Sequence, residues 1–597
     1  MSEANGHHHG MPTFDDALRS LDDRFSRLRD EARIPGVAWG VVLDGALVHA
    51  GGAGTIRDGE DRRPDAGSVF RIASMTKSFT AATVLLLRDE GRLRLDEPVA
   101  AYVPELARWP LPTADSVPVT VRQLLTMSAG LATDDPWGDR QQGMPLDRFA
   151  ELLAAGPSFA WPPGTVYDYS NLGYGILGRV ITNVAGAEYR EVVRDRLLGP
   201  LGMTTTAYRE EDVPEARLAH GYVRREDAYV GEGRDPYGAL ASMGGVFSCV
   251  EDLAQWVAGF IDAFPARDDP EGGHPLRRAT RREMQQVQRA FGPEVPAHDP
   301  DAEAQVQSRG YGFGLFVLQD LEIGTTVSHA GGYPGFGSHM AWHPATGLGV
   351  IGLGNVRYAP VRPVVAEMLA MLVRAEVAPR RRVRPAPAVE AFRPVVEGLL
   401  ARWDDAVADA VFAVNTDLDE PRDLRRAEAA KMAGELGPFR RDPGRPDRSA
   451  SPADLAWWLR GSHGWVRASI LVTPEPEPRL QQLALLPVGD PSPALRSVAE
   501  RILGLAASPT AEWPVDLPVG GDLDTQAVLP ALRAGGNHFG ALRLGLPIDG
   551  DGRASSTFEI ESDRGRLELK VALDPNTGSL TTAALLVRTR EAPPERW

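Results

Sequence analysis

The order of apolar and polar residues predicts a helix and then a β-hairpin at the start of the chain. Residues 14–33 repeat apolar positions at the spacing of one helical face, with acidic residues in the first turn. Two short apolar runs follow over residues 36–54, and Asp44-Gly45 between them is typical of a hairpin turn. The apolar positions of the helix are Leu18, Leu21, Phe25 and Leu28.

The middle of the chain, residues 92–310, is rich in turns and helical patterns, and strand patterns return after it. Strands at both ends with helices between them predict one sheet whose first and last strands are far apart in sequence. The expected helices are 121–128, 146–155, 172–184, 189–198 and 361–375. The expected later strands are 311–318, 325–330, 338–343 and 348–355.

A Pro- and Arg-rich stretch without periodicity, residues 378–390, predicts a linker after a first domain of residues 13–377. An internal repeat follows, because residues 465–486 and 566–586 both read as strand, Pro-containing turn and strand. Leu480 matches Leu580 at an offset of 100 residues, and each hairpin follows a helical pattern. Those two helical patterns are residues 392–403 and 495–506. We therefore expect two tandem α+β modules, residues 391–488 and 489–597.

Composition narrows the classes of function. At 597 residues the chain is long enough for several domains, and its net charge of −17 argues against binding a phosphate backbone. The sequence holds no apolar run of the length needed to cross a bilayer, so we expect a cytoplasmic protein without membrane contacts. We expect residues 1–12, which include three histidines, to be a disordered leader, and the single cysteine, Cys249, to be a small buried hydrophobe.

The rarity of lysine draws attention to one motif. Only three of the 64 basic residues are lysines, yet Lys77 lies three residues after Ser74 at the start of an apolar helical pattern. Positions i and i+3 share a helical face, so the amine can reach the hydroxyl. Burial and the helix dipole both lower the pKa of such a lysine, which can then act as a base where an arginine cannot. The alternative is a capping serine beside a snorkelling lysine.

Two further stretches carry groups that could take part in proton transfer or in substrate binding. Tyr169-Ser170-Asn171 lies in a turn before a Gly-rich helix, and a tyrosine beside a positive charge can be held as phenolate and accept a proton. The second stretch begins at His329 and runs through Ala330, Gly331 and Gly332, where glycines along a strand allow a substrate backbone to approach. Alone, each stretch also fits ordinary packing or a tight turn.

Together these motifs resemble the serine β-lactamase and penicillin-binding protein superfamily, specifically its class C-like branch. The resemblance covers about residues 14–378 and rests on "FRIASMTKSFTAA", "LRLDEPVAAYVPEL", "QLLTMSAGL", "PPGTVYDYSNLGYGILG" and "HAGGYPGFGS", in the order of the family. It implies an α/β fold, a β-lactamase-like antiparallel sheet flanked by helices with an inserted helical subdomain. The two C-terminal α+β modules would follow that domain.

The resemblance also implies residue roles. Ser74 would be the nucleophile and Lys77 the base that activates it. Tyr169 would be a second acid and base, relaying a proton to the leaving group and later activating water. Asn171 would hydrogen-bond Lys77 or the acyl side of the substrate. The reaction would be acylation of the serine followed by hydrolysis of the acyl-enzyme.

The same resemblance places the oxyanion hole at the backbone N–H groups of Ser74 and Gly332, with Ala330 and Gly331 along the substrate. His329 stands where class C β-lactamases carry lysine. A histidine at this position resembles the DD-peptidases and D-aminopeptidases more closely, and it offers a less dependable positive charge than lysine. Met127 stands where many relatives carry histidine.

The expected function is hydrolysis of an ester or amide, as a carboxylesterase or a D-aminopeptidase-like amidase acting on a small ester, amide or short peptide. A β-lactamase or DD-peptidase is the alternative, and a catalytically silent scaffold or ligand-binding protein a further one. We expect no cofactor and no metal, because His339 and His343 on one strand would be roughly 13 Å apart, too far for one ion. We expect no nucleic-acid partner, and the C-terminal modules could form a homo-oligomer.

Overall fold

The computed structural model describes residues 13–233, 235–294, 307–320, 323–381, 383–508, 510–520, 523–562 and 566–588. The predicted leader, residues 1–12, lies outside them. The chain divides into two compact units, one up to Arg381 and one from Arg382. Each is described by itself.

The first unit is built around an eight-stranded antiparallel sheet in the order β2-β1-β12-β11-β10-β9-β8-β7. Val37 of β1 pairs with Gly354 of β12, so strands from the two ends of the unit are neighbours, as the sequence predicts. The strands are β1 (Gly36–Leu43), β2 (Ala46–Gly54), β7 (Arg289–Glu294), β8 (Gln307–Tyr311), β9 (Phe316–Asp320), β10 (Gly324–Tyr333), β11 (Phe336–His343) and β12 (Leu348–Gly354).

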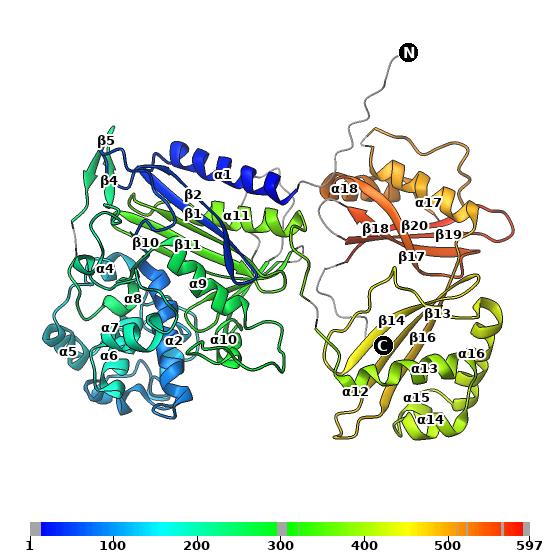
Figure 1. Ribbon diagram of the computed structural model, residues 1–597, viewed down its shortest axis with the longest axis horizontal. Helices are drawn as coiled ribbons and strands as arrows, with labels where there is room; N and C mark the ends of the chain where they lie inside the picture. Colours follow the sequence, from blue (N-terminus) through cyan, green and yellow to red (C-terminus); the bar gives the residue numbers. More distant parts are fainter. Residues whose placement is uncertain are drawn as a thin grey trace, which may run out of the picture. The chain divides into compact units, whose positions relative to one another are not determined.

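Helices cover both faces of this sheet. Helices α1 (Phe14–Glu31) and α11 (Val361–Arg374) pack on one face, and α9 (Val250–Ile261) packs on the other (Figure 1). The predicted amphipathic pattern is confirmed in α1, where Phe25 is fully buried and stacks on Trp39 with ring centroids 5.2 Å apart. The helix ends at Glu31 with Ala32 as its C-cap, and the chain leaves the helical conformation at Arg33, whose backbone is left-handed (φ 48°).

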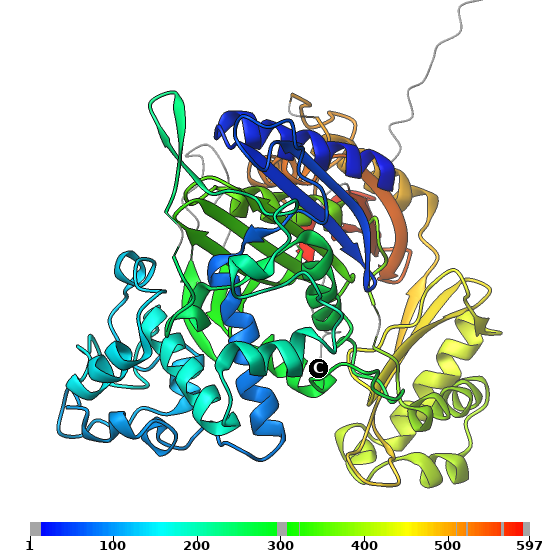
Figure 2. The same ribbon diagram turned by 60° about the vertical axis from the view of Figure 1, so that its left-hand side comes forward.

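The segment between β2 and β7 supplies the helical part of the unit, beside the face covered by α9. It contains α2 (Thr76–Asp89), α3 (Val121–Leu125), α4 (Asp135–Gly138), α5 (Leu146–Ala155), α6 (Asn171–Ala185), α7 (Tyr189–Val193), α8 (Ala241–Gly244) and α10 (Arg278–Met284). It also forms the small sheets β3 (Phe70–Arg71) with β6 (Phe247–Ser248) and β4 (Tyr222–Arg225) with β5 (Ala228–Gly231). The β4–β5 hairpin projects from the unit in Figures 1 and 2.

Two turns decide how the strands run. The hairpin at Asp44-Gly45 is confirmed, with both residues in the left-handed region (φ 48° and 90°). The continuous strand predicted over 311–318 is wrong, because a turn at Gly314 (φ 70°) separates β8 from β9. A Cβ at Gly314 would lie 2.7 Å from the Lys77 carbonyl oxygen, so the turn packs directly against α2. The apolar run suggested a strand because Phe313 and Leu315 are core residues.

The second unit contains two four-stranded antiparallel sheets, in the orders β13-β14-β15-β16 and β17-β18-β19-β20. Their strands are β13 (Arg440–Arg441), β14 (Asp454–Arg460), β15 (Gly464–Val472), β16 (Leu480–Gly489), β17 (Leu542–Asp549), β18 (Ser555–Ser562), β19 (Arg566–Leu573) and β20 (Leu580–Arg588). The helices are α12 (Pro387–Glu390), α13 (Phe392–Ala401), α14 (Asp405–Val411), α15 (Thr416–Asp419), α16 (Arg422–Leu436), α17 (Pro493–Ala506) and α18 (Thr525–Phe539).

The internal repeat is visible in the pairing of these sheets. Leu480 and Leu580 each begin the last strand of a module. In both modules the strand that pairs with it, β15 or β19, has a register shift before its last residue. Phe412 forms a parallel bridge to Leu480, and Val519 forms the same bridge to Leu580. The two α+β modules are therefore confirmed in architecture, whereas their exact boundaries stay predictions. Helix α12 occupies the end of the segment predicted as a linker.

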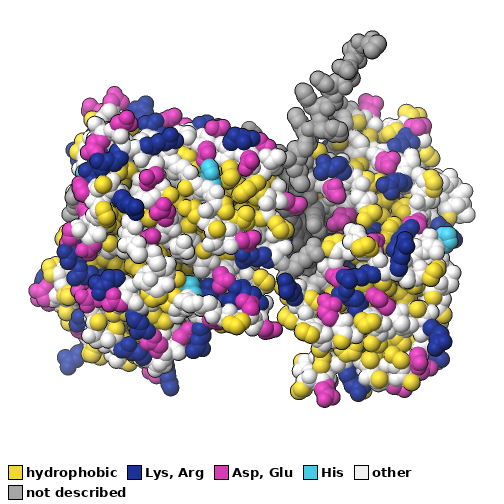
Figure 3. All heavy atoms as spheres, in the orientation of Figure 1, with side chains coloured by type: hydrophobic (Ala, Val, Ile, Leu, Met, Phe, Trp, Pro, Cys, Tyr) yellow, Lys and Arg dark blue, Asp and Glu magenta, His cyan; other side chains and the backbone are white. Residues whose placement is uncertain are grey.

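The surface charges and the lengths of the helices concern the predicted absence of nucleic-acid and membrane partners. Figure 3 shows basic and acidic side chains interspersed over the visible face of each unit. Among the described residues, no helix combines the length and the apolar character that a membrane crossing requires. A cytoplasmic location stays a prediction.

Candidate active site

Ser74 lies in a 3₁₀ turn, Ala73–Met75, that leads directly into α2. Ala73 has a left-handed backbone (φ 49°), a conformation that costs free energy for any residue with a Cβ and is often found at functional sites. Ala73 and Met75 are buried, whereas Ser74 is partly exposed. The turn therefore presents the hydroxyl to solvent at the N-terminal end of a buried helix.

Lys77 is fully buried in the first turn of α2, and its amine has three neighbours. Nζ lies 2.7 Å from Asn171 Oδ1, 2.9 Å from the Met243 carbonyl oxygen and 3.0 Å from Ser74 Oγ. The first two neighbours can only accept hydrogen bonds, and the hydroxyl can donate one. A neutral amine has two N–H donors and one lone pair, so it satisfies all three neighbours with the lone pair directed at the Ser74 hydroxyl.

The electrostatics make that neutral form accessible near neutral pH. Burial lowers the pKa of Lys77 to about 8, against the opposing attraction of nearby carboxylates, Asp135 first among them. The predicted lowering is thus confirmed in direction. At neutral pH roughly a tenth of such lysines are unprotonated, far more than for a solvated lysine.

Asn171 is held in one orientation by an aspartate that no sequence motif marks. Its Nδ2 donates to Asp135 Oδ1 at 2.7 Å, which fixes Oδ1 toward Lys77. Asp134 accepts from the backbone N–H groups of Asn171 (2.6 Å) and Leu172 (2.8 Å) at the start of α6. The dipeptide Asp134-Asp135 before a proline is a weak sequence signal, and the Met243 carbonyl gives none.

Tyr169 completes the group around the serine. The Ser74 side chain is close enough to lower the pKa of Tyr169, and Lys77 Nζ lies 4.7 Å from the centroid of the tyrosine ring. Burial raises the pKa of Tyr169 well above its usual value, and the neighbouring Asp135 charge raises it further. The phenolate suggested by the sequence is therefore wrong for the resting site. The hydroxyl is neutral, so Tyr169 can donate a proton and Lys77 is the group able to accept one.

His329 is buried and uncharged. Burial, together with the positive charge of Lys77, lowers its pKa to about 3. Nε2 lies 3.2 Å from the Tyr311 hydroxyl and Nδ1 lies 2.7 Å from the Ala330 carbonyl oxygen. His329 therefore offers no positive charge, which agrees with the expectation from its replacement of lysine.

The strand that carries His329 has an open edge beside the serine. Strand β9 pairs with β10 only as far as Ser328, so residues 329–333 pair on one side alone, with β11. A Cβ at Gly331 would lie 2.1 Å from the Ile72 carbonyl oxygen, which shows how closely the strand approaches the segment before Ser74. Ala330 and Gly332 flank Gly331 in this unpaired part of the strand, so the strand can receive a substrate backbone there.

We predict that Gly331→Ala destabilises the first unit by about 1–3 kcal/mol, because a backbone atom must move to admit the new methyl group. Gly231→Ala is the matched control, since no atom lies within 4 Å of its added Cβ. Urea denaturation of both variants measures the difference. Equal midpoints for the two variants would contradict the close approach.

Met127 and His343 lie outside the group around Ser74, whereas His339 is buried on β11 opposite Ala330. Met127 has a left-handed backbone (φ 55°), and its sulfur accepts from the Ser170 N–H at 3.4 Å, which places it behind the Tyr169 segment. His343 is fully buried beside Thr346, and among the described residues no group of three metal-ligating side chains occurs. Cys249 is buried, as predicted.

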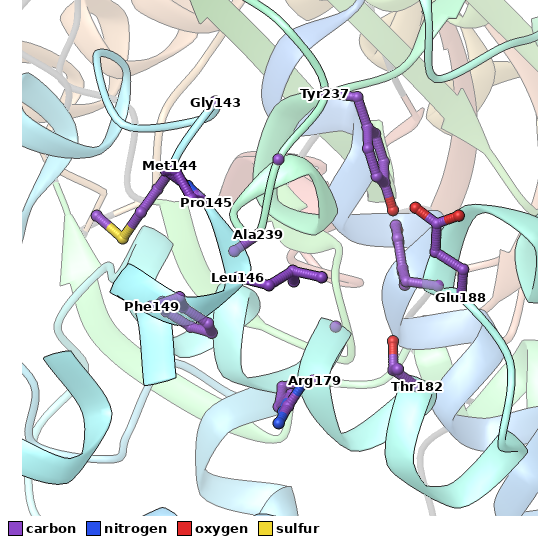
Figure 4. A pocket seen from close by; sticks show the side chains of 13 residues that line it. Gly143, Met144, Pro145, Leu146, Phe149, Arg179, Thr182, Glu188, Tyr237 and Ala239 are labelled. Atoms are coloured by element: carbon purple, nitrogen blue, oxygen red, sulfur yellow. The ribbon is translucent and has the colours of Figure 1, made fainter. Parts of the chain in front are cut away.

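A cavity of about 380 Å³ lies among α5, α6 and α7, and none of the predicted site residues lines it (Figure 4). Its wall is mostly apolar, with Arg179, Thr182 and Glu188 as polar members. The cavity is therefore distinct from the group around Ser74.

The chain is similar to several known proteins. The family described as Beta-lactamase matches residues 21–375. "D-alanyl-D-alanine-carboxypeptidase/endopeptidase AmpH" of Escherichia coli (strain K12) is 28% identical over 323 residues, 52% of this chain and 76% of that protein. "Penicillin-binding protein 4" of Amycolatopsis lactamdurans is 34% identical over 201 residues, 34% of this chain and 52% of that protein. The solved structure of "the octameric penicillin-binding protein homologue from Pyrococcus abyssi" has a TM-score of 0.51 at 18% identity, covering 96% of this chain and 98% of that one, which supports the fold.

Proposed function

The chain belongs to the Beta-lactamase family of serine hydrolases, and we propose that it cleaves a small ester or amide through an acyl-serine intermediate, as a carboxylesterase or a D-aminopeptidase-like amidase. The observation that carries this proposal is the buried Lys77 amine, lowered in pKa and 3.0 Å from the Ser74 hydroxyl. A scaffold without activity gives no reason for that arrangement.

The proposed reaction follows from the contacts. Lys77 accepts the proton of Ser74 as its oxygen attacks the carbonyl carbon of the substrate, and Asn171 and the Met243 carbonyl hold the resulting ammonium. Tyr169 donates a proton to the departing alcohol or amine and is reprotonated from Lys77. Water then attacks the acyl-enzyme, its proton passing to Tyr169 as the Tyr169 hydroxyl gives its own proton to Lys77, and the Lys77 ammonium finally returns a proton to the departing Ser74 oxygen.

The Ser74 and Gly332 backbone N–H groups are the proposed donors to the developing oxyanion. The open edge of β10 beside the serine supports this assignment, and loss of one such donor typically costs about 10²–10³ in kcat. Ala330 and Gly331 would lie along the bound substrate.

The uncharged His329 favours substrates without a carboxylate at that end of the cleft. The name of the Escherichia coli relative, a D-alanyl-D-alanine-carboxypeptidase, supports a DD-peptidase or β-lactamase as the second candidate. A panel of chromogenic esters, D- and L-aminoacyl anilides and a chromogenic cephalosporin distinguishes them. Ester or D-anilide turnover that Ser74→Ala abolishes supports the first proposal, and cephalosporin turnover supports the second. The absence of turnover and of any Ser74 adduct with every substrate supports the scaffold alternative.

We predict that kcat/KM for a neutral ester rises with pH through a limb near pH 8. The base must be unprotonated, and protonation of Lys77 below its pKa of about 8 removes it. Asp139, whose pKa burial raises to about 6 and which feels the charge of Lys77, is a second group that could titrate in this range. The limb near pH 8 should persist in Asp139→Asn, and a flat profile from pH 6 to 9 would contradict the role of Lys77.

The homo-oligomer expected from the sequence also stays a proposal. The penicillin-binding protein homologue from Pyrococcus abyssi is octameric, and that assembly supports it. Light scattering on the full chain, coupled to size exclusion, measures whether this protein assembles.

A further inference from the structure

Tyr358 is an unusual residue in the segment that follows β12. Its backbone is left-handed (φ 50°), although its side chain is large, and the side chain is half exposed. Its N–H donates to the Tyr333 carbonyl oxygen at the end of β10, at 3.3 Å. A left-handed tyrosine costs free energy relative to glycine at the same place. The placement of the ring therefore needs an explanation.

The ring packs against Gly332, on the face of β10 opposite to the one that Gly331 turns toward Ile72. A Cβ at Gly332 would be 2.8 Å from Tyr358 Cδ1, so the glycine is what allows the ring to sit there. The Tyr358 hydroxyl donates to Asp139 Oδ2 at 2.8 Å. Asp139 is more than nine-tenths buried and caps the C-terminal end of α4.

The partner of Tyr358 belongs to the opposite wall of the cleft. Gly138, next to Asp139, packs on Asn171, since a Cβ there would be 2.8 Å from the Asn171 Cβ. Asn171 in turn contacts Lys77. The group around Ser74 thus has β10 on one side and the α4 segment with the start of α6 on the other. The Tyr358–Asp139 hydrogen bond joins these two walls beyond Gly332.

The two ends of the cleft differ in chemistry. Around His329 the neighbours are aromatic, with Tyr311 6.1 Å and Phe316 5.3 Å away between ring centroids. Beyond Gly332 the groups are polar, because Tyr333 donates to Asp235 at 2.5 Å and its ring lies 3.6 Å from the buried guanidinium of Arg71. The Tyr358–Asp139 hydrogen bond therefore lies at the end beyond Gly332, where the polar groups already pair with one another.

We propose that Tyr358 and Asp139 form a bar across this end of the cleft and limit the length of the substrate group that extends beyond Gly332. This inference rests on the proposed hydrolase function. It makes Tyr358 a specificity-determining residue, without a part in proton transfer. The favoured substrates carry a short group on that side of the scissile bond.

The test uses the full-length protein and two ester series. One varies the acyl chain of p-nitrophenyl esters from acetyl to octanoyl, and the other varies the alcohol of acetate esters over the same lengths. Tyr358→Gly removes the ring and suits the left-handed backbone, so it does not threaten folding. Tyr358→Phe keeps the ring and loses the hydrogen bond, and Val48→Ala is the control, because Val48 is exposed on β2, the strand at one edge of the sheet, with three strands between it and β10.

In Tyr358→Gly the ratio of kcat/KM for the longest to the shortest ester should rise roughly tenfold or more in one of the two series, since each accommodated methylene can contribute that much. The series that changes identifies whether the acyl or the alcohol group lies beyond Gly332. Tyr358→Phe should change the ratio less, and Val48→Ala should not change it. If the enzyme is active and the ratios are unchanged in both series, the proposed bar is wrong and the proposed hydrolase function stands. Absence of turnover and of any Ser74 adduct in the wild type overturns the proposed function and this inference with it.

Discussion

Replacing Ser74 with alanine will reduce ester or amide turnover by at least about 10³-fold, because removal of the nucleophile removes the acyl-enzyme route altogether. The contacts of Lys77 with Asn171 and Met243 do not depend on the hydroxyl, so the fold should be retained. Initial rates with the best substrate of the panel measure the loss.

The control for this prediction is Ser20→Ala, an exposed serine on α1, on the other face of the sheet. It should keep the wild-type rate. A Ser74→Ala protein that folds and still turns over substrate within a few-fold of the wild type would exclude the acyl-serine mechanism.

Replacing Lys77 with arginine will cost about 10²–10⁴-fold in kcat, although the positive charge is kept. An arginine stays protonated at any accessible pH, so it cannot accept the serine proton, and its larger planar head has no room beside Asn171 and Met243. Lys77→Met, which has a similar volume and no charge, should lose a similar factor.

The pH profile distinguishes a base from a structural lysine. Both Lys77 variants should lose the limb near pH 8 along with the rate. A variant that loses rate but keeps that limb would show that another group titrates there, and that Lys77 acts only through packing.

The local part of the site could be predicted from sequence. Ser74 and Lys77 share a helical face at i and i+3, and an apolar helix around them implies burial and a lowered pKa, which the structure shows. The first helix and the Asp44-Gly45 hairpin follow in the same way from short-range patterns, and the two C-terminal modules follow from an internal repeat of such patterns. These features depend on residues close together in the chain.

The rest depends on contacts between distant segments. The Met243 carbonyl, Asp135 and the Tyr358–Asp139 bridge reach the cleft only through the tertiary fold, and no local pattern marks them. The phenolate hypothesis for Tyr169 failed because it counted the lysine charge and left out the larger cost of burial.

The most direct test of the acyl-serine mechanism is the mass of the protein during turnover. Full-length protein is incubated with an activated ester, quenched in acid, and measured intact and after proteolysis. We predict an increase equal to one acyl group, located on the peptide that contains Ser74 and absent from Ser74→Ala. Turnover accompanied by an adduct on another residue, or turnover that continues in Ser74→Ala, would contradict the mechanism.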